Sequence, residues 1–325
     1  MKKIIGFMGN ALLSIYGKYN EIKTRYLIKN LQKNKGCKYL STRIKINQDE
    51  LFDILLDLND KGITLELLTY LIREEENMLN LKEILKENKF EYILDIGANI
   101  GYFVLFESKF SNCKKIYALE PVKRNYNLLK INCLINDNFE KIITINKGIG
   151  EKNEQSIIYV PEEGNQASLL LKNNFSHNVK KERISLITLE SLINKYNISL
   201  NNVLIRMDIE GYEYNFVKNN LNLLKNMKNS WYILEFHPHI IGIDKSIDFI
   251  NMLESCDFEL NRVVIDYPIH ISSLGNLKEL GKMFFKWRIG NRWVGTISKI
   301  SFDELKKAIK NNKLTKTPHL YLYKK

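Results

Sequence analysis

Six ionisable residues of this chain lie in or just after short apolar runs, in a pattern that could gather them at one reactive site. They are Asp95, Glu120, Asp208, Glu210, Glu235 and His237. Short apolar runs are typical of buried strands, and ligands of open α/β sheets bind outside the carboxyl ends of those strands. We therefore expect these side chains to surround one crevice, where crowded carboxylates repel one another unless a cation relieves them.

The glycines after the first run indicate which ligand the crevice could take. A dinucleotide fold needs three glycines spaced G-x-G-x-x-G to approach a pyrophosphate, whereas only Gly97 and Gly101 follow Asp95. Asp95 would repel a pyrophosphate but attract an ammonium group, and Glu120 could accept hydrogen bonds from a ribose diol. A ligand with ribose, a cationic amino-acid end and no phosphates is S-adenosylmethionine. The alternative is a ligand-free α/β domain whose glycines only turn the chain.

The pair Glu235 and His237 suggests how an acceptor hydroxyl could be activated. Methyl transfer from a sulfonium is an in-line displacement, which needs aligned reactants and a group that takes the acceptor's proton. His237 is the best base by its ordinary pKa, and Glu235 or Asp208 would orient it. The alternative is that His237 only caps its strand by bonding a neighbouring carbonyl, while Pro238 ends the strand.

Asp208 and Glu210 have two competing interpretations. Their carboxylates either position donor and acceptor through hydrogen bonds or hold a divalent ion, magnesium or manganese, that acidifies the acceptor hydroxyl. We favour the metal-free interpretation, because the spacing shows no dedicated cage. Gly211 is expected to provide a positive φ or a close approach, and Glu213 is expected only to begin the next helix.

From residue 91 onward the sequence alternates between strand and helix patterns, which is typical of a sheet with helices on both faces. A helix should begin near Gly101 and present Phe103, Phe106 and Phe110 on one face. The expected parallel strands are 92–96, 115–119, 141–146, 202–207 and 231–236, with two further strands at 258–265 and 319–323.

Two other segments should form walls of the site. The polar, β-prone stretches 156–160, 167–171 and 183–187 predict a hairpin over one side of it. Residues 286–293 interleave cations with two tryptophans, which predicts either a surface for stacking sugars or bases or a surface loop anchored by the tryptophans.

Residues 1–90 are expected to form a mainly helical N-terminal cap, and residues 91–325 the α/β domain. Apolar spacing predicts helices over 49–58, 65–71 and 74–85, and weak alternation predicts a strand over 38–46. The first residues could begin a secretory signal, but no convincing cleavage site follows them. Helical spacing from Phe7 to Tyr16 instead indicates an amphipathic helix that packs on the domain or contacts a membrane surface or partner.

Five motifs in order resemble the FkbM family of S-adenosylmethionine-dependent methyltransferases. They are Asp-Ile-Gly-Ala-Asn-Ile-Gly at 95–101, Glu120-Pro121, Thr188-Leu189-Glu190, Asp-Ile-Glu-Gly-Tyr-Glu at 208–213 and Glu-Phe-His at 235–237. The resemblance covers about residues 74–258 and departs at Arg206, where lysine is commoner, and at Lys147-Gly148, where a small apolar residue is usual. It implies a Rossmann-like class I fold with a seven-stranded, mostly parallel sheet. It also implies a hydroxyl acceptor on a small molecule, sugar or glycoconjugate, and a donor site formed by Asp95, Gly97, Asn99, Gly101, Glu120 and Pro121.

Composition leaves two other functions open. The net charge of +12 would suit a nucleic acid as the acceptor, although lysine is spread along the whole chain. A non-catalytic binding protein on the same fold is the other alternative. The four cysteines form no C-x-x-C pair, so neither a zinc site nor a disulfide framework is indicated and a reducing, cytoplasmic compartment fits best. No apolar stretch approaches the roughly 20 residues that cross a bilayer.

Overall fold

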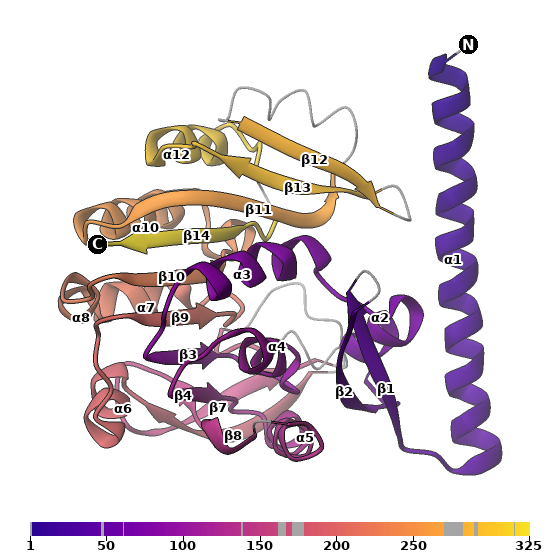
Figure 1. The fold of residues 1–325 in the computed structure, drawn as a ribbon, viewed down its shortest axis with the longest axis horizontal. Coiled ribbons are helices and arrows are strands. Elements are labelled where there is room, and N and C mark those ends of the chain that lie inside the picture. The colour runs from indigo at the N-terminus through magenta and orange to yellow at the C-terminus, as the bar shows by residue number, and fades with distance from the viewer. Residues whose placement is uncertain are drawn as a thin grey trace.

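The computed structural model describes residues 2–46, 49–60, 62–137, 139–161, 167–170, 179–269, 282–288, 292–314 and 316–325. Within these ranges the main sheet has nine strands in the order β12-β13-β11-β14-β10-β9-β3-β4-β5, and two smaller sheets lie beside it (Figure 1).

Seven of these strands are those that the sequence predicts. Five neighbours run parallel: β10 (Ser230–Glu235), β9 (Val203–Met207), β3 (Tyr92–Ile96), β4 (Lys115–Leu119) and β5 (Ile142–Ile145). The other two, β14 (His319–Lys324) and β11 (Glu259–Ile269), run antiparallel to their partners. The Rossmann-like α/β prediction is therefore confirmed.

The expected surface loop over residues 286–293 is wrong, because two further strands extend the sheet there. In β12 (Lys282–Arg288) and β13 (Arg292–Ser298), Trp287 pairs with Trp293 across an antiparallel ladder. Aromatic residues favour strands, and β13 also pairs with β11. Pairing with β11 satisfies backbone groups that a free sheet edge would leave open.

Helices cover both faces of the sheet, and alternate strand residues enter two separate cores. Ile93 and Ile116 pack with α3 (Glu75–Glu87), α4 (Tyr102–Phe110) and α5 (Lys123–Leu134). Leu94 and Tyr117 face the opposite core. That core includes residues of α6 (Leu189–Tyr196), α7 (Glu213–Asn219), α8 (Leu221–Lys225), α10 (Ile243–Ser255) and α12 (Phe302–Lys310). Helix α4 begins where predicted, and Thr188 caps α6 by accepting a hydrogen bond from the Ser191 amide.

In the described part of the N-terminal extension, three helices accompany a two-stranded sheet. The expected helix over 49–58 is wrong: β2 (Asp49–Asp57) pairs with β1 (Tyr39–Ile46), which confirms the strand predicted over 38–46. The apolar residues of this segment fit both helical and strand periods, and burial of every second residue, Phe52, Ile54 and Leu56, favours the strand. The helices expected next are confirmed as α2 (Ile63–Tyr70) and α3.

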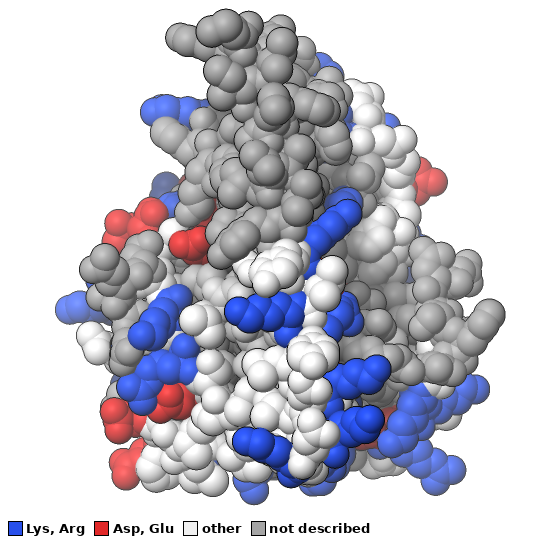
Figure 2. Space-filling view, turned by 90° about the vertical axis from the view of Figure 1, so that its right-hand side faces the viewer, with Lys and Arg blue, Asp and Glu red and all other residues white. Residues whose placement is uncertain are grey.

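The first helix, α1 (Lys2–Lys35), stands as a long column beside the rest of the chain (Figure 1). It contacts α2, and Figure 2 shows Lys and Arg side chains on the face of the molecule that it occupies. No helix in the described ranges combines the length and hydropathy that a membrane span requires.

The predicted hairpin insertion is confirmed. Strands β7 (Gln155–Val160) and β8 (Lys180–Ile187) pair antiparallel, and the short β6 (Gly148–Ile149) joins β8 in parallel. Ser168 bridges to Tyr159, which ties the described part of the connecting segment to β7.

Candidate active site

A glycine turn brings the end of β3 against the end of β9. Gly97 has φ +89°, and a Cβ atom there would lie 1.9 Å from the Asp208 carbonyl oxygen. Only glycine permits that approach. Gly101 has a different task, since its Cβ would lie 2.8 Å from Leu129 of α5. Gly101 therefore allows α4 to pack against α5 rather than lining the site.

Glu120 follows β4 and is held by backbone amides. Its two carboxylate oxygens accept hydrogen bonds from the Asn99 and Val122 amides, each at 2.9 Å, and it is 5% exposed. Burial raises its pKa to about 8, against the opposing effect of the two amides. Each oxygen keeps a further lone pair for a ligand hydroxyl.

A recess lies over these strand ends. The sequence predicted one part of its lining, and the structure places it there: Gly97, Asn99, Glu120, Pro121, Asp208 and Glu210. The other part was predicted only as a hairpin and supplies an apolar wall: Ile149, Ile158, Ala167, Leu169 and Ile184. Lys147, Gly148 and Asn125 also line the recess.

Asp95 lies outside this recess. It is fully buried, and its Oδ1 accepts a hydrogen bond from Arg206 Nη1 at 3.0 Å. The guanidinium also lies 3.7 Å from the centroid of the Phe103 ring. Burial raises the Asp95 pKa and Arg206 opposes that shift. Arg206 already supplies a countercharge for Asp95. Contact between Asp95 and a ligand ammonium therefore stays a prediction.

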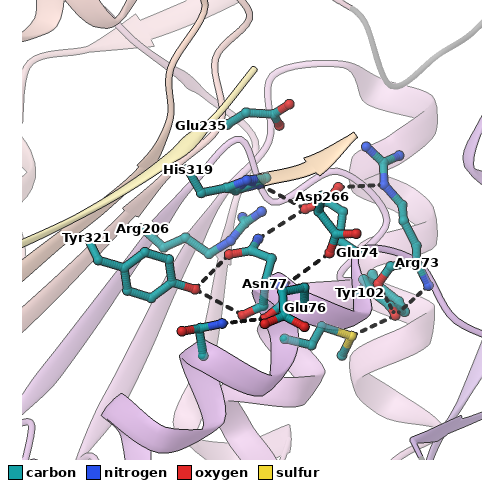
Figure 3. Close-up of polar contacts among 12 residues, drawn as sticks. Arg73, Glu74, Glu76, Asn77, Tyr102, Arg206, Glu235, Asp266, His319 and Tyr321 are labelled. Carbon is teal, nitrogen blue, oxygen red and sulfur yellow. Dashed lines mark hydrogen bonds and ion pairs between the residues drawn. The ribbon is translucent and has the colours of Figure 1, made fainter. Parts of the chain in front are cut away.

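Next to the recess lies a group of mostly buried charged side chains that we call the ionic crevice. It comprises Arg73, Glu74, Asp208, Glu210, Glu213, Glu235, His237 and His319. Figure 3 shows Arg73 and Glu74, from the N-terminal extension, facing Arg206 and His319 of the sheet. Arg73 Nε donates to Glu74 Oε1 at 2.7 Å, and His319 Nε2 lies 3.0 Å from Glu74 Oε2.

The sequence did not flag Arg73, Glu74 or His319, because none of them belongs to a motif. Burial lowers the His319 pKa to about 4, so its imidazole is neutral at neutral pH. Glu74 and Glu210 also have positive φ angles, of +49° and +51°. Such conformations of non-glycine residues cluster at functional sites.

His237 is positioned by Glu213 rather than by Glu235 or Asp208. Its Nδ1 lies 2.6 Å from Glu213 Oε1, and its Nε2 lies 3.6 Å from Glu210 and 3.8 Å from Glu235. Glu213 was expected only to begin a helix; it does begin α7, but its side chain is fully buried. The alternative in which His237 bonds a carbonyl is also wrong for Nδ1, because its partner is a carboxylate.

The pKa of His237 argues against its role as the base that takes the acceptor's proton. Burial lowers the His237 pKa, but Glu213 and the neighbouring carboxylates outweigh burial and raise it to about 10. The ring is therefore an imidazolium at neutral pH, which cannot accept a proton. Burial together with Glu210 raises the Asp208 pKa to about 6, and burial raises that of Glu235 well above its usual range. The crevice thus carries carboxylates with increased proton affinity.

Two groups of side chains in the described ranges have ligand atoms close enough to share a metal ion. One comprises Asp208, Glu235 and His237, and the other Glu74, Glu235 and His319. Within each group the ligand atoms lie within 4.8 Å of one another.

Gly211, as predicted, has a positive φ of +102° where the chain turns between Glu210 and α7.

Three similar solved structures share little sequence identity with this chain. The FkbM methyltransferase of Methylobacillus flagellatus is 15% identical, with 71% of this chain and 53% of that one covered and a TM-score of 0.36. The precorrin-6y C5,15-methyltransferase of Geobacter metallireducens is 10% identical, with 79% and 92% covered and a TM-score of 0.40. The Methanocaldococcus jannaschii tRNA m1G37 methyltransferase is 13% identical, with 88% and 55% covered and a TM-score of 0.40.

This chain spans about half the length of the first of these structures. No curated protein matches its sequence. The family model described as the methyltransferase FkbM domain matches residues 95–260, which is just over half of the chain. That match contains the glycine turn, Glu120, the 208–213 turn and His237, and the chain therefore belongs to the FkbM methyltransferase family.

Proposed function

We propose that this protein transfers a methyl group from S-adenosylmethionine to a hydroxyl, most suitably on a sugar or glycoconjugate. The observation that carries the proposal is the position of Glu120: a buried carboxylate, held by two backbone amides, that faces the recess beside a glycine turn. A ribose diol matches its remaining acceptor capacity. Family membership supports the same donor.

The recess has complementary walls for the rest of this donor. Gly97 and Asn99 expose backbone beside Glu120, whereas Ile149, Ile158 and Leu169 offer an apolar surface for a flat base. Asp208 and Glu210 line the recess as well as the ionic crevice, so a sulfonium between them would gain favourable charge interactions. The acceptor would then approach from the crevice.

The crevice suits a polar acceptor. Its carboxylates can accept hydrogen bonds from several hydroxyls, as recognition of a sugar requires. In the proposed reaction the acceptor oxygen bonds to the methyl carbon while the carbon–sulfur bond breaks, and neutral S-adenosylhomocysteine leaves. The acceptor proton passes to a carboxylate of the 208–210 turn, because His237 is already protonated.

Transfer of a labelled methyl group tests this function. The chain would be incubated with methyl-labelled S-adenosylmethionine and, separately, with a saccharide panel and with total RNA. The proposal predicts label in an alkali-stable ether on a saccharide. Label in RNA, with binding that falls steeply as salt rises, would instead favour the nucleic-acid alternative to which the net charge of +12 points.

We also propose that α1 contacts an anionic membrane surface. Tyr19, Ile22 and Tyr26 share one face of this helix and are 60%, 66% and 68% exposed. Exposed cations at Lys18, Lys23 and Lys29 flank them, and this combination of aromatic and basic side chains favours a membrane interface.

Sedimentation with vesicles tests this surface. The protein should sediment with phosphatidylcholine vesicles that contain phosphatidylglycerol and remain free with phosphatidylcholine alone. Tyr26→Ser should weaken sedimentation, whereas Tyr39→Ser, an exposed tyrosine on β1, should not. Equal sedimentation by both variants, or binding of RNA without binding of vesicles, would contradict the proposal.

A further inference from the structure

The end of the crevice nearest the recess contains three potential ligand groups from two neighbouring strand ends. Asp208 follows β9, Glu235 ends β10, and His237 comes two residues later. Their ligand atoms lie within 4.8 Å of one another. Metal–ligand bonds of about 2.0–2.2 Å place ligands on opposite sides of an ion about 4 Å apart, so this spacing suits one ion between the three groups.

His237 is prepared as a ligand by its other nitrogen. Glu213 holds Nδ1 at 2.6 Å and thereby fixes the plane of the ring. Metal-binding histidines usually have this arrangement, with the second ring nitrogen bonded to a carboxylate. Nε2 is left facing Glu210 and Glu235, beyond hydrogen-bond distance of both, in a side chain that is 1% exposed.

Orphaned polar atoms supply independent support. In the described part of the chain, His237 Nε2 and Asp208 Oδ1 are buried and have no hydrogen-bond partner. A buried polar atom without a partner costs about 1–3 kcal/mol, and three carboxylates near one ring repel one another. A divalent cation between these side chains would give both orphaned atoms a partner and relieve the repulsion among the carboxylates.

We infer that Asp208, Glu235 and His237 bind one divalent transition-metal ion, for which Mn²⁺ is the best match. Binding of the ion displaces the proton from His237 Nε2, while Nδ1 keeps its proton and its contact with Glu213. Two carboxylate oxygens suit a hard ion, and an imidazole nitrogen favours a transition metal over Mg²⁺ or Ca²⁺. Three protein ligands leave coordination positions open for water or an acceptor hydroxyl.

The neighbouring group of Glu74, Glu235 and His319 is a weaker candidate, because Glu74 is already engaged. Arg73 donates to its Oε1 at 2.7 Å, and Asn77 donates to its Oε2 at 3.0 Å. Figure 3 shows Glu74 among these partners of the N-terminal extension. Because Glu235 belongs to both groups, a variant of His319 separates them.

The role of the ion, unlike its binding, rests on the proposed methyl transfer. Asp208 lines the recess, so an ion on its carboxylate would lie beside the donor. An acceptor hydroxyl on that ion is more acidic, and Glu210 takes its proton as the oxygen bonds to the methyl carbon and the carbon–sulfur bond breaks. This assignment replaces the metal-free interpretation that the sequence favoured.

A titration with Mn²⁺ tests the site. The full chain is first treated with a chelator, and the electron paramagnetic resonance signal then reports how much Mn²⁺ stays free. We expect one bound Mn²⁺ per chain. Asp208→Asn and Glu235→Gln should each weaken binding at least tenfold, and Glu213→Gln by roughly ten- to a hundredfold, because it fixes the ring of His237. His319→Asn should leave the affinity unchanged.

The midpoint of thermal unfolding of each variant serves as the control for folding. A chain that binds S-adenosylhomocysteine but no Mn²⁺ would overturn the inference, and so would Mn²⁺ binding that His319→Asn abolishes while Asp208→Asn preserves it. A chain that binds Mn²⁺ at the three residues but not S-adenosylhomocysteine would retain the metal site and refute the proposed donor.

Discussion

The recess and the ionic crevice lie side by side but are constructed differently. The recess places one carboxylate, Glu120, between two backbone amides and adds a glycine turn and apolar walls. The crevice contains an arginine, two histidines and several carboxylates, which contact one another across elements from Arg73 to His319. Backbone groups define the first region, whereas long-range pairs of charges define the second.

This difference implies different sensitivities. A site formed by backbone amides keeps its shape when one side chain changes, as long as the turn remains intact. A buried charge network depends on every partner, because the removal of one member leaves another charge uncompensated. We therefore expect crevice substitutions to affect stability and recess substitutions to affect ligand affinity.

The largest effect should follow the loss of Arg206, a buried cation that borders the ionic crevice. Arg206→Ala removes the partner of fully buried Asp95 and should lower the free energy of unfolding by about 3–5 kcal/mol. Arg206→Lys keeps the charge but loses the planar contact with Phe103, which should cost about 1 kcal/mol. Urea unfolding measures both. Equally small losses would show that Asp95 simply takes up a proton, and that the pair contributes little.

A slightly smaller loss should follow Gly97→Ala, which lies where the two regions meet. The new Cβ would clash with the Asp208 carbonyl at 1.9 Å, and overpacking together with an unfavourable φ should cost about 3 kcal/mol. Gly36→Ala is the matched control: its φ is +60°, but no atom lies within 4 Å of the new Cβ. It should lose only about 1 kcal/mol in the same urea experiment. Equal losses would mean that the positive φ, rather than the close approach to Asp208, is the reason for glycine at position 97.

Replacing one carboxylate in each region by its amide should separate the tasks of the two regions. In Glu120→Gln the new amide group faces a backbone N–H, so the affinity for S-adenosylhomocysteine should fall by about 1.5–3 kcal/mol, or roughly ten- to a hundredfold. Glu235→Gln should change that affinity by less than about threefold, because Glu235 does not line the recess. Calorimetry measures both variants. A similar loss in both would abolish the distinction between recess and crevice.

The smallest effect should be a dependence of donor-site affinity on pH. Burial raises the pKa of Glu120 to about 8, so below pH 8 the free protein holds a proton that the ribose hydroxyls must displace. Affinity for S-adenosylhomocysteine should therefore rise as pH increases toward 8, by at most about tenfold per unit, and level off above it. Glu120→Gln should flatten the profile between pH 6 and 9. A wild-type profile that is equally flat would remove Glu120 from the binding equilibrium.

The same contrast explains how much of the site the sequence could predict. Gly97, Asn99 and Glu120 belong to one βαβ unit, so local spacing was enough to place them together. Asp208, Glu235 and His237 could be placed because parallel strands share one carboxyl edge. The partner of His237 could not, because Glu213 also fits the first turn of a helix, and only packing shows that its side chain turns inward.

Contacts between distant segments were the main omission. Nothing near Arg73 or Glu74 indicates that they would meet His319 at the far end of the chain. The strand at Asp49–Asp57 was missed because its apolar residues fit two periods, and only its pairing with β1 decides between them. The strands at Lys282–Arg288 and Arg292–Ser298 likewise depend on pairing with each other and with β11.

Calorimetric titration of the purified chain with S-adenosylhomocysteine, with NAD as the comparison ligand in the same buffer, most directly tests the assignment of the recess. We predict one S-adenosylhomocysteine site per chain, weakened in Glu120→Gln, and no binding of NAD. Absence of S-adenosylhomocysteine binding in a folded chain, or preference for NAD, would contradict the assignment.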